Sequence, residues 1–329
     1  MKRAFKYLLI IFPLLFAGEL KAQQLPLYSQ YLMNGFMINP AMAGYDGYTA
    51  VNLTYRQQWI GFVEAPRTYS AAFSSRLFRK SHKIVSSPLR RGNMLIPSTK
   101  GRVGLGGYII NDVNANVART GLSFTYAYHI ILNNQQLSFG LSAKAFQYRI
   151  NTDVLDFGED GDPVLNSDFA KVAYSPDADF GVLFNGVDYF VGLSISNLLQ
   201  SEVKIGAYNG VDFETNRHYW LMGGYRFALS RDLEIEPGTL LKTSENWNPQ
   251  GELSVRLYYL KDLWAGISYR SNETMIAMVG ARFENVFFGY SYDWTFSEIG
   301  NYSYGSHEFI VSVKMGDNSR RTRGGKVRY

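Results

Sequence analysis

The chain contains no cysteine. A disulfide framework, a thiolate-ligated metal and an acylated N-terminal cysteine are therefore excluded. Histidine is scarce as well: the four histidines are scattered, and none has a carboxylate partner at metal-ligand spacing. The run Ser306-His307-Glu308 is contiguous, whereas catalytic triads are assembled from distant segments. We predict that the protein is not an enzyme and holds no metal or cofactor.

Long apolar runs are missing beyond the first 22 residues. Residues 1–22 have a basic start, an apolar core too short to span a bilayer, and Ala22 at a suitable cleavage point. We therefore predict a signal peptide that is removed. No later segment reaches the roughly 18 uninterrupted apolar residues of a transmembrane helix. Helical membrane spans are not expected, and any crossing has to use strands.

Aromatic residues and glycine are abundant, with 24 Tyr, 22 Phe and 31 Gly. Apolar and polar residues alternate with the period of two that is typical of strands, as at Leu122 to Ile130 and Leu253 to Tyr259. We predict fourteen strands, most of them long enough to cross a bilayer at a tilt. Their expected ranges are 48–57, 66–76, 102–111, 119–131, 135–148, 177–184, 188–198, 215–228, 232–242, 248–260, 262–270, 273–282, 284–293 and 306–315.

Connection lengths indicate that the sheet closes. From the fourth predicted strand onward, every second connection is tight, and most of the others are long. Short turns on one rim and long loops on the other are typical of outer-membrane barrels. Two connections depart from this rule, the short Ser271-Asn272 and the long 77–101. A soluble sandwich would have shorter strands without rim asymmetry, and a propeller would show a repeat that is absent here. The expected fold is an all-β transmembrane antiparallel barrel.

Charge is unevenly distributed. Segment 77–101 has six basic residues and no acid, and 316–329 has five against one acid, whereas the remainder of the mature chain is acidic. The basic segments suit an acidic partner or anionic lipid, and nucleic acid is not expected in the periplasm. Segment 149–176 holds six carboxylates, but it lacks the ligand spacing of an EF-hand. A solvated loop is favoured there over a calcium site.

The sequence divides into a signal peptide (1–22), a leader (23–47), a barrel (48–315) and a basic tail (316–329). The leader is predicted either to plug the barrel or to lie along its periplasmic rim. Both chain ends are expected in the periplasm, because short turns face that side. Charged residues on the polar strand faces predict a polar network in the lumen, comprising Lys144, His218, Arg226, Arg256, Asp293 and Glu308. Such a lumen suits a closed scaffold or, alternatively, a porin or substrate channel.

The ordered motifs of the mature chain resemble the PorP/SprF family of Bacteroidetes outer-membrane proteins. They run from Ser29-Gln30-Tyr31, Asn39-Pro40-Ala41, Ala43-Gly44, Asn52, Tyr55-Arg56 and Gln58-Trp59 through 137–141, 176–181, His218-Tyr219 and 264–270 to 300–303 and 305–308. This resemblance implies an accessory role in type IX secretion and gliding motility, with other secretion components, periplasmic lipoproteins and adhesin-like cargo as partners. The cargo and the oligomeric state are left open.

We expect partners to bind at the most family-like segments and at the basic tail. The residues concerned are Asn39, Pro40, Gly44, Arg56, Gln58, Trp59, Arg320, Arg321 and Arg323. On this hypothesis the leader and the basic segments form one periplasmic face, and the barrel surface meets outer-membrane lipid.

Overall fold

The computed structural model describes residues 28–77, 82–86, 93–97, 101–132, 135–150, 172–204 and 212–315. The predicted signal peptide, most of the acidic segment, and the basic tail with Arg320, Arg321 and Arg323 lie outside these ranges. None of the helices within them has the length and apolar character that a bilayer crossing requires.

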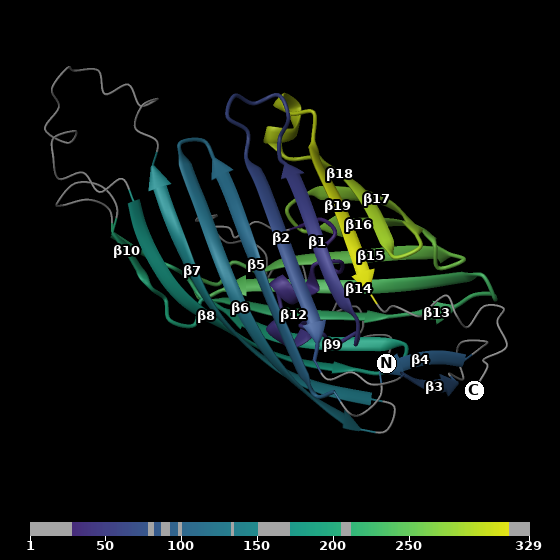
Figure 1. Cartoon of the computed structure of the whole chain (residues 1–329). Helices are drawn as coiled ribbons and strands as arrows, with labels where there is room; N and C mark the ends of the chain where they lie inside the picture. The colour runs from purple at the N-terminus through teal and green to yellow at the C-terminus, as the bar shows by residue number, and fades with distance from the viewer. Residues whose placement is uncertain are drawn as a thin grey trace, which may run out of the picture.

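The described chain forms a closed antiparallel β-barrel of fourteen strands, as predicted (Figure 1). Each strand pairs with its neighbour in the sequence around the wall, and β19 pairs with β1 to close it. The barrel strands are β1 (Thr49–Gln57), β2 (Arg67–Arg76), β5 (Val103–Asn114), β6 (Val117–Leu132), β7 (Gln135–Ile150), β8 (Val172–Asn185), β9 (Tyr189–Ser196), β12 (His218–Tyr225) with β13 (Phe227–Ala228), β14 (Leu233–Ser244), β15 (Gln250–Tyr259), β16 (Leu263–Arg270), β17 (Thr274–Phe283), β18 (Val286–Thr295) and β19 (Ser306–Met315).

Strands β12 and β13 are one crossing interrupted at Arg226. Both pair with β14, and between them the backbone N–H of Arg226 donates to the carbonyl of Asp188 at 2.7 Å, outside the ladder. The predicted strand boundaries are mostly within three residues of the observed ones. The largest error is at the start of β8, which begins at Val172 instead of 177. That stretch contains Pro176, which interrupts a pattern-based prediction even though the barrel accommodates it.

The two faces of the barrel differ in the way the alternation predicts. On β6, Leu122 and Phe124 are about 60% exposed on the outside, whereas Ser123 and Thr125 are buried inside. The exposed apolar side chains form a band around the wall that includes Leu53, Phe73, Ile109, Leu141, Leu193, Leu253, Ile267, Val279 and Phe309. An apolar exterior with a polar interior is the arrangement of a barrel whose solvent outside is lipid.

The barrel has two unlike rims. We call the rim with the connections 133–134, 186–188, 229–232, 260–262 and 284–285 the short-turn rim, and the opposite one the long-loop rim. β1 begins and β19 ends at the short-turn rim. Two small hairpins were not predicted: β3 (His82–Ser86) with β4 (Asn93–Pro97) at the short-turn rim, and β10 (Glu202–Lys204) with β11 (Asp212–Glu214) at the long-loop rim. Strands of three to five residues are too short for alternation to be recognised.

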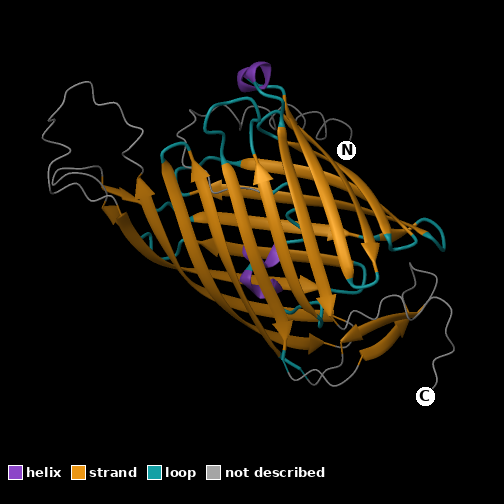
Figure 2. Cartoon of the chain, turned by 45° about the horizontal axis from the view of Figure 1, so that its top comes forward, coloured by secondary structure: helices purple, strands orange, loops and turns teal. Residues whose placement is uncertain are grey.

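The described part of the leader, residues 28–47, lies inside the barrel (Figure 2). It contains two short 3-10 helices, η1 (Gly35–Met37) and η2 (Pro40–Met42), and its buried side chains pack against the inner faces of several strands. A third such helix, η4 (Glu298–Tyr302), stands at the long-loop rim. The leader is the main occupant of the lumen and therefore positions the candidate site.

Candidate functional site: an occupied lumen

The leader runs along the lumen from one rim toward the other. Ser29 lies beside Arg56 near the long-loop end of β1, whereas Gly44 lies beside Arg76 at the short-turn end of β2. Between these ends the leader does not alternate apolar and polar residues, and its backbone shape is set by capping and proline residues. Asn39 caps η2 by accepting a hydrogen bond from Ala41 N at 2.9 Å, and Pro40 occupies the first helical position.

Glycines on the inner wall make room for this turn. We call Gly104, Gly140, Gly181 and Gly192, on β5, β7, β8 and β9, the glycine seat. A Cβ at Gly140 would lie 2.2 Å from Pro40 C, and one at Gly181 would lie 2.1 Å from Asn39 Oδ1. A Cβ at Gly104 would meet the Ala43 carbonyl oxygen at 2.0 Å. A side chain at any of these positions would collide with the leader, so the leader can lie this close to the wall only because these positions are glycine.

Polar side chains bind the seated turn on both sides. Asn39 Nδ2 donates to the carbonyls of Val182 at 3.1 Å and Leu193 at 3.2 Å, on neighbouring strands of the wall. Ser194 Oγ donates to the Ile38 carbonyl at 2.8 Å. Asn39 is fully buried, so each of its polar atoms needs such a partner. One amide thus caps a helix and fixes it to the barrel.

At the short-turn end, wall side chains satisfy the carbonyls that follow η2. Arg76 Nε donates to the Gly44 carbonyl at 2.8 Å, and Gln136 Oε1 accepts from the same guanidinium at 2.8 Å. His129 Nε2 lies 3.1 Å from the Ala43 carbonyl. A carbonyl only accepts, so Nε2 carries the proton and Nδ1 accepts from Ser138 Oγ at 2.8 Å. Gly44 has a φ of 67°, which favours glycine at this turn.

At the long-loop end, a buried charge cluster holds the start of the leader. Arg56 forms ion pairs with Asp293 at 2.7 Å and Glu308 at 3.1 Å. The backbone N–H groups of Ser29 and Gln30 donate to Glu308 at 2.8 and 2.9 Å. Ser29 Oγ donates to Asp293 at 2.7 Å. Two carboxylates against one guanidinium leave a negative excess, and the leader's donors satisfy the remaining lone pairs.

Further along, the leader contacts the opposite wall through Tyr31, whose hydroxyl lies 3.5 Å from Ser254 Oγ. Burial raises the pKa of Tyr31 to about 12, so the phenol keeps its proton at physiological pH.

The six residues predicted for the lumen all lie on the inner wall, but in separate clusters. Arg56 joins Asp293 and Glu308, whereas Lys144 pairs with Asp179 at 2.5 Å. His218 is buried beside Trp220. Arg226 and Arg256 share the carboxylate of Glu236.

Sequence reasoning missed Asp179, Glu236 and Arg270 as partners. The register of neighbouring strands could have revealed two of these partners. Glu236 on β14 lies opposite Arg256 on β15. Glu252 on β15 lies opposite Arg270 on β16, and the two form an ion pair at 2.8 Å.

The residues predicted for partner binding do not form one surface. Asn39 and Pro40 are buried in the glycine seat, and Gly44 lies near the short-turn rim. Arg56 is buried toward the other rim, where Trp59 N donates to Ser306 Oγ at 3.1 Å and Gln58 N donates to the Pro66 carbonyl. Their role in partner binding stays a prediction.

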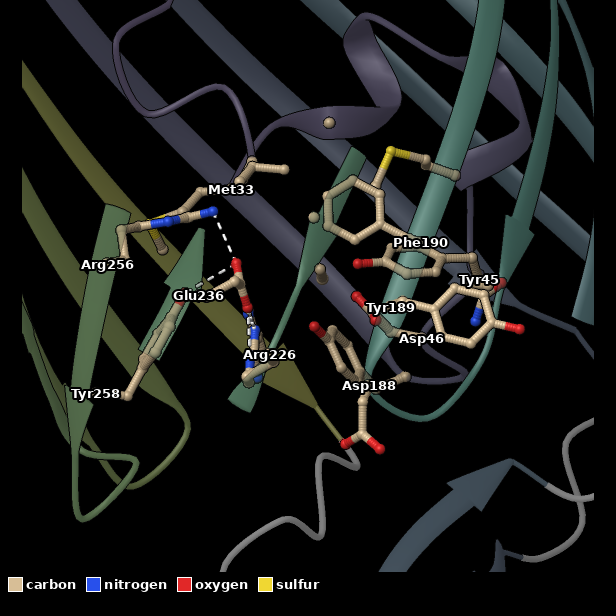
Figure 3. A pocket seen from close by; sticks show the side chains of 18 of the residues that line it. Met33, Tyr45, Asp46, Asp188, Tyr189, Phe190, Arg226, Glu236, Arg256 and Tyr258 are labelled. Atoms are coloured by element: carbon tan, nitrogen blue, oxygen red, sulfur yellow. Dashed lines mark hydrogen bonds and ion pairs between the residues drawn. The ribbon is translucent and has the colours of Figure 1, made fainter. Parts of the chain in front are cut away.

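The lumen retains a cavity of about 410 Å³ at the short-turn end of the leader, which we call the vestibule (Figure 3). On one side lie Arg226, Glu236 and Arg256 with Tyr258, and on the other lie Tyr45, Asp46, Asp188 and Tyr189. The described residues contain no group of three His, Asp or Glu side chains that could hold a metal ion. The charged and aromatic side chains that line the vestibule are the groups available to bind a ligand.

Comparison with known proteins gives a family and a set of structurally similar barrels. The outer-membrane protein Omp33 of Acinetobacter baumannii has 7% identity and a TM-score of 0.45, over 83% of this chain and 99% of that one. A FadL homologue of Pseudomonas aeruginosa has 11% identity and a TM-score of 0.45, over 84% and 92%. The translocator domain of the autotransporter NalP from Neisseria meningitidis has 12% identity and a TM-score of 0.43, over 87% and 95%.

No curated protein sequence matches the chain. The family described as "Type IX secretion system membrane protein PorP/SprF" matches residues 20–313. This match covers the leader and almost all of the barrel, so the chain belongs to the PorP/SprF family of type IX secretion system membrane proteins.

Proposed function

We propose that this protein is a non-enzymatic outer-membrane scaffold of type IX secretion, whose barrel is closed by its own leader and docks or anchors other proteins. The observation that carries the proposal is the fit of residues 28–47 in the lumen. The leader is held by a glycine seat, a buried charge cluster and side-chain hydrogen bonds to its carbonyls. An internal segment bound at both ends narrows the lumen, which favours a plugged scaffold over an open diffusion channel.

The periplasmic side of this scaffold is the short-turn rim. Barrels of this kind have short turns in the periplasm and long loops outside. The two basic segments, 77–101 and 316–329, are both attached at that rim, since β2 and β19 end there. Periplasmic lipoproteins and other secretion components would bind at this rim, and adhesin-like cargo at the long-loop rim.

A porin or substrate channel is the competing function, and the charged lumen with its vestibule favours it. Conductance of the purified barrel in planar bilayers separates the two. The scaffold should be silent, and deletion of residues 28–47 should produce steady currents. Large currents from the intact chain would refute the scaffold.

Partner docking has its own test. Pull-down from native membranes with the intact chain should recover periplasmic secretion components, and removal of residues 316–329 should weaken that recovery while the barrel stays heat-modifiable on gels. Unchanged recovery would count against a role for the tail.

A further inference from the structure

The vestibule is a built cavity that the leader does not fill. Its volume of about 410 Å³ falls within the range of about 300–1,000 Å³ that is usual for ligand sites. The wall that surrounds it is a closed sheet, so bilayer lipid has no lateral entry. Entry is through the short-turn rim, where the strand ends and turns that line the cavity lie. The occupant therefore comes from the compartment that this rim faces.

One side of the vestibule presents a fixed cationic group. Arg226 and Arg256 both pair with the single carboxylate of Glu236, and the neighbouring Glu234 pairs with Lys261 at 4.0 Å. Three cations against two carboxylates leave one positive charge in excess on this side. The Arg226 side chain is 36% exposed, and its guanidinium stacks 4.6 Å above the ring of Tyr258. Stacking and pairing hold the guanidinium still, so a ligand carboxylate would meet a pre-oriented donor.

Two further cations line the cavity beside an aromatic ring. Lys314 Nζ lies 4.2 Å from the ring centre of Phe287, and the Arg282 guanidinium lies 4.8 Å from the same ring. The described lining carries five cationic side chains against four carboxylates. The potential at this mouth favours an anionic occupant.

The other side of the vestibule combines aromatic rings with the carboxylates of Asp46 and Asp188. Tyr189 and Tyr225 are stacked, with ring centres 6.4 Å apart and planes 10° apart, and Phe190 and Tyr45 lie next to them. Such a surface binds rings and aliphatic chains, not isolated small ions. Together, the two sides suit a chain that carries both carboxylates and aromatic groups.

We propose that the vestibule binds an acidic, aromatic-containing peptide segment of a periplasmic protein, with Arg226 as its central carboxylate contact. The inference rests on the proposed docking function and names its site. Recognition of acidic motifs by arginine clusters is a recurrent mode of peptide binding.

The test uses the full chain in zwitterionic detergent micelles and a labelled peptide in which Glu and Asp alternate with Tyr. Fluorescence anisotropy should show saturable binding that weakens with salt. Arg226→Gln should weaken the affinity roughly tenfold, because one charge-assisted contact is lost. Arg217→Gln is the matched control: that arginine is 35% exposed, pairs with Glu245 and lies at the long-loop rim, so the affinity should not change.

A second variant acts in the opposite direction and does not disturb the Glu236 cluster. Asp46→Asn removes a carboxylate from the lining and should tighten binding of the acidic peptide several-fold. Equal binding of a peptide with Lys in place of the acids would overturn the proposal, as would displacement by phosphatidylglycerol vesicles or an unchanged affinity in both variants. One outcome is that the peptide fails to bind while the intact barrel conducts no current in planar bilayers and still recovers partners in the pull-down. That result would refute the peptide-binding inference and leave the scaffold function standing. Large currents from the intact chain would refute the scaffold itself.

Discussion

Gly140 is the position at which the fit between the leader and the wall can be tested most directly. In Gly140→Ala the new Cβ would lie 2.2 Å from both Pro40 C and Ala41 N. An ordinary contact is about 3.5 Å, so the leader has to move away by about 1.3 Å. Such a shift breaks the bonds from Asn39 to Val182 and Leu193, because both are already 3.1 to 3.2 Å long.

The expected cost follows from the contacts that are lost. Two hydrogen bonds at about 1 kcal/mol each, with about 1 kcal/mol of overpacking, weaken leader docking by about 3 kcal/mol. That energy corresponds to a rise of about a hundredfold in the undocked population. The barrel itself should be unaffected, since strands tolerate alanine in place of glycine.

The assay uses the absence of native cysteine. A Met42→Cys reporter is buried in the docked leader, where Met42 is 3% exposed, and should react slowly with a maleimide. Adding Gly140→Ala should raise the labelling rate by about a hundredfold. Gly223→Ala is the matched control, because its Cβ would meet nothing closer than 3.5 Å. Equal labelling in the two backgrounds, with both barrels heat-modifiable, would show that the glycine seat does not hold the leader.

Three further outcomes are expected. Arg56→Met leaves Asp293 and Glu308 without their cation and should lower the free energy of unfolding by about 3–5 kcal/mol. The loss is measured as a lower temperature at which the folded band converts to the unfolded band on gels. Adding Asp293→Asn and Glu308→Gln should restore most of the lost stability. Asn39→Asp keeps the oxygen that caps η2 but replaces the Nδ2 donor with a second oxygen, which faces the carbonyls of Val182 and Leu193. Labelling of the cysteine reporter should therefore rise at least about tenfold. An unchanged labelling rate would contradict the assigned hydrogen bonds. Leu141→Arg places a charge in the outer apolar band and should cost about 2–4 kcal/mol in urea unfolding from lipid vesicles; a neutral result would mean that this face does not meet lipid.

The strands were predictable because their signal is local. On β6 and β7, the face of each residue follows from its neighbours two positions away, and the alternation continues over whole crossings. The start of β8 and the two small hairpins were not predictable, because proline or short length interrupts the same signal.

The candidate site was only partly predictable. An isolated glycine within a strand indicates close approach of another backbone, and Gly140 and Gly181 carry that signal. It does not say which segment approaches. The leader has no repeating pattern, and the groups that bind it come from β1, β2, β6, β8, β9, β15, β18 and β19.

The sequence by itself determined the number of crossings, the outward and inward faces, and the difference between the rims, since all three depend on residues close together in the chain. The tertiary structure alone decided where the leader lies and which charges pair. Arg56 and Glu308 become partners only when β1 and β19 close the barrel, across a separation of 252 residues. Closure of the barrel fixes both the strand register and the shape of the lumen. Glycines on separate strands are thereby brought together on the inner wall, where Asn39 and Pro40 pack against them.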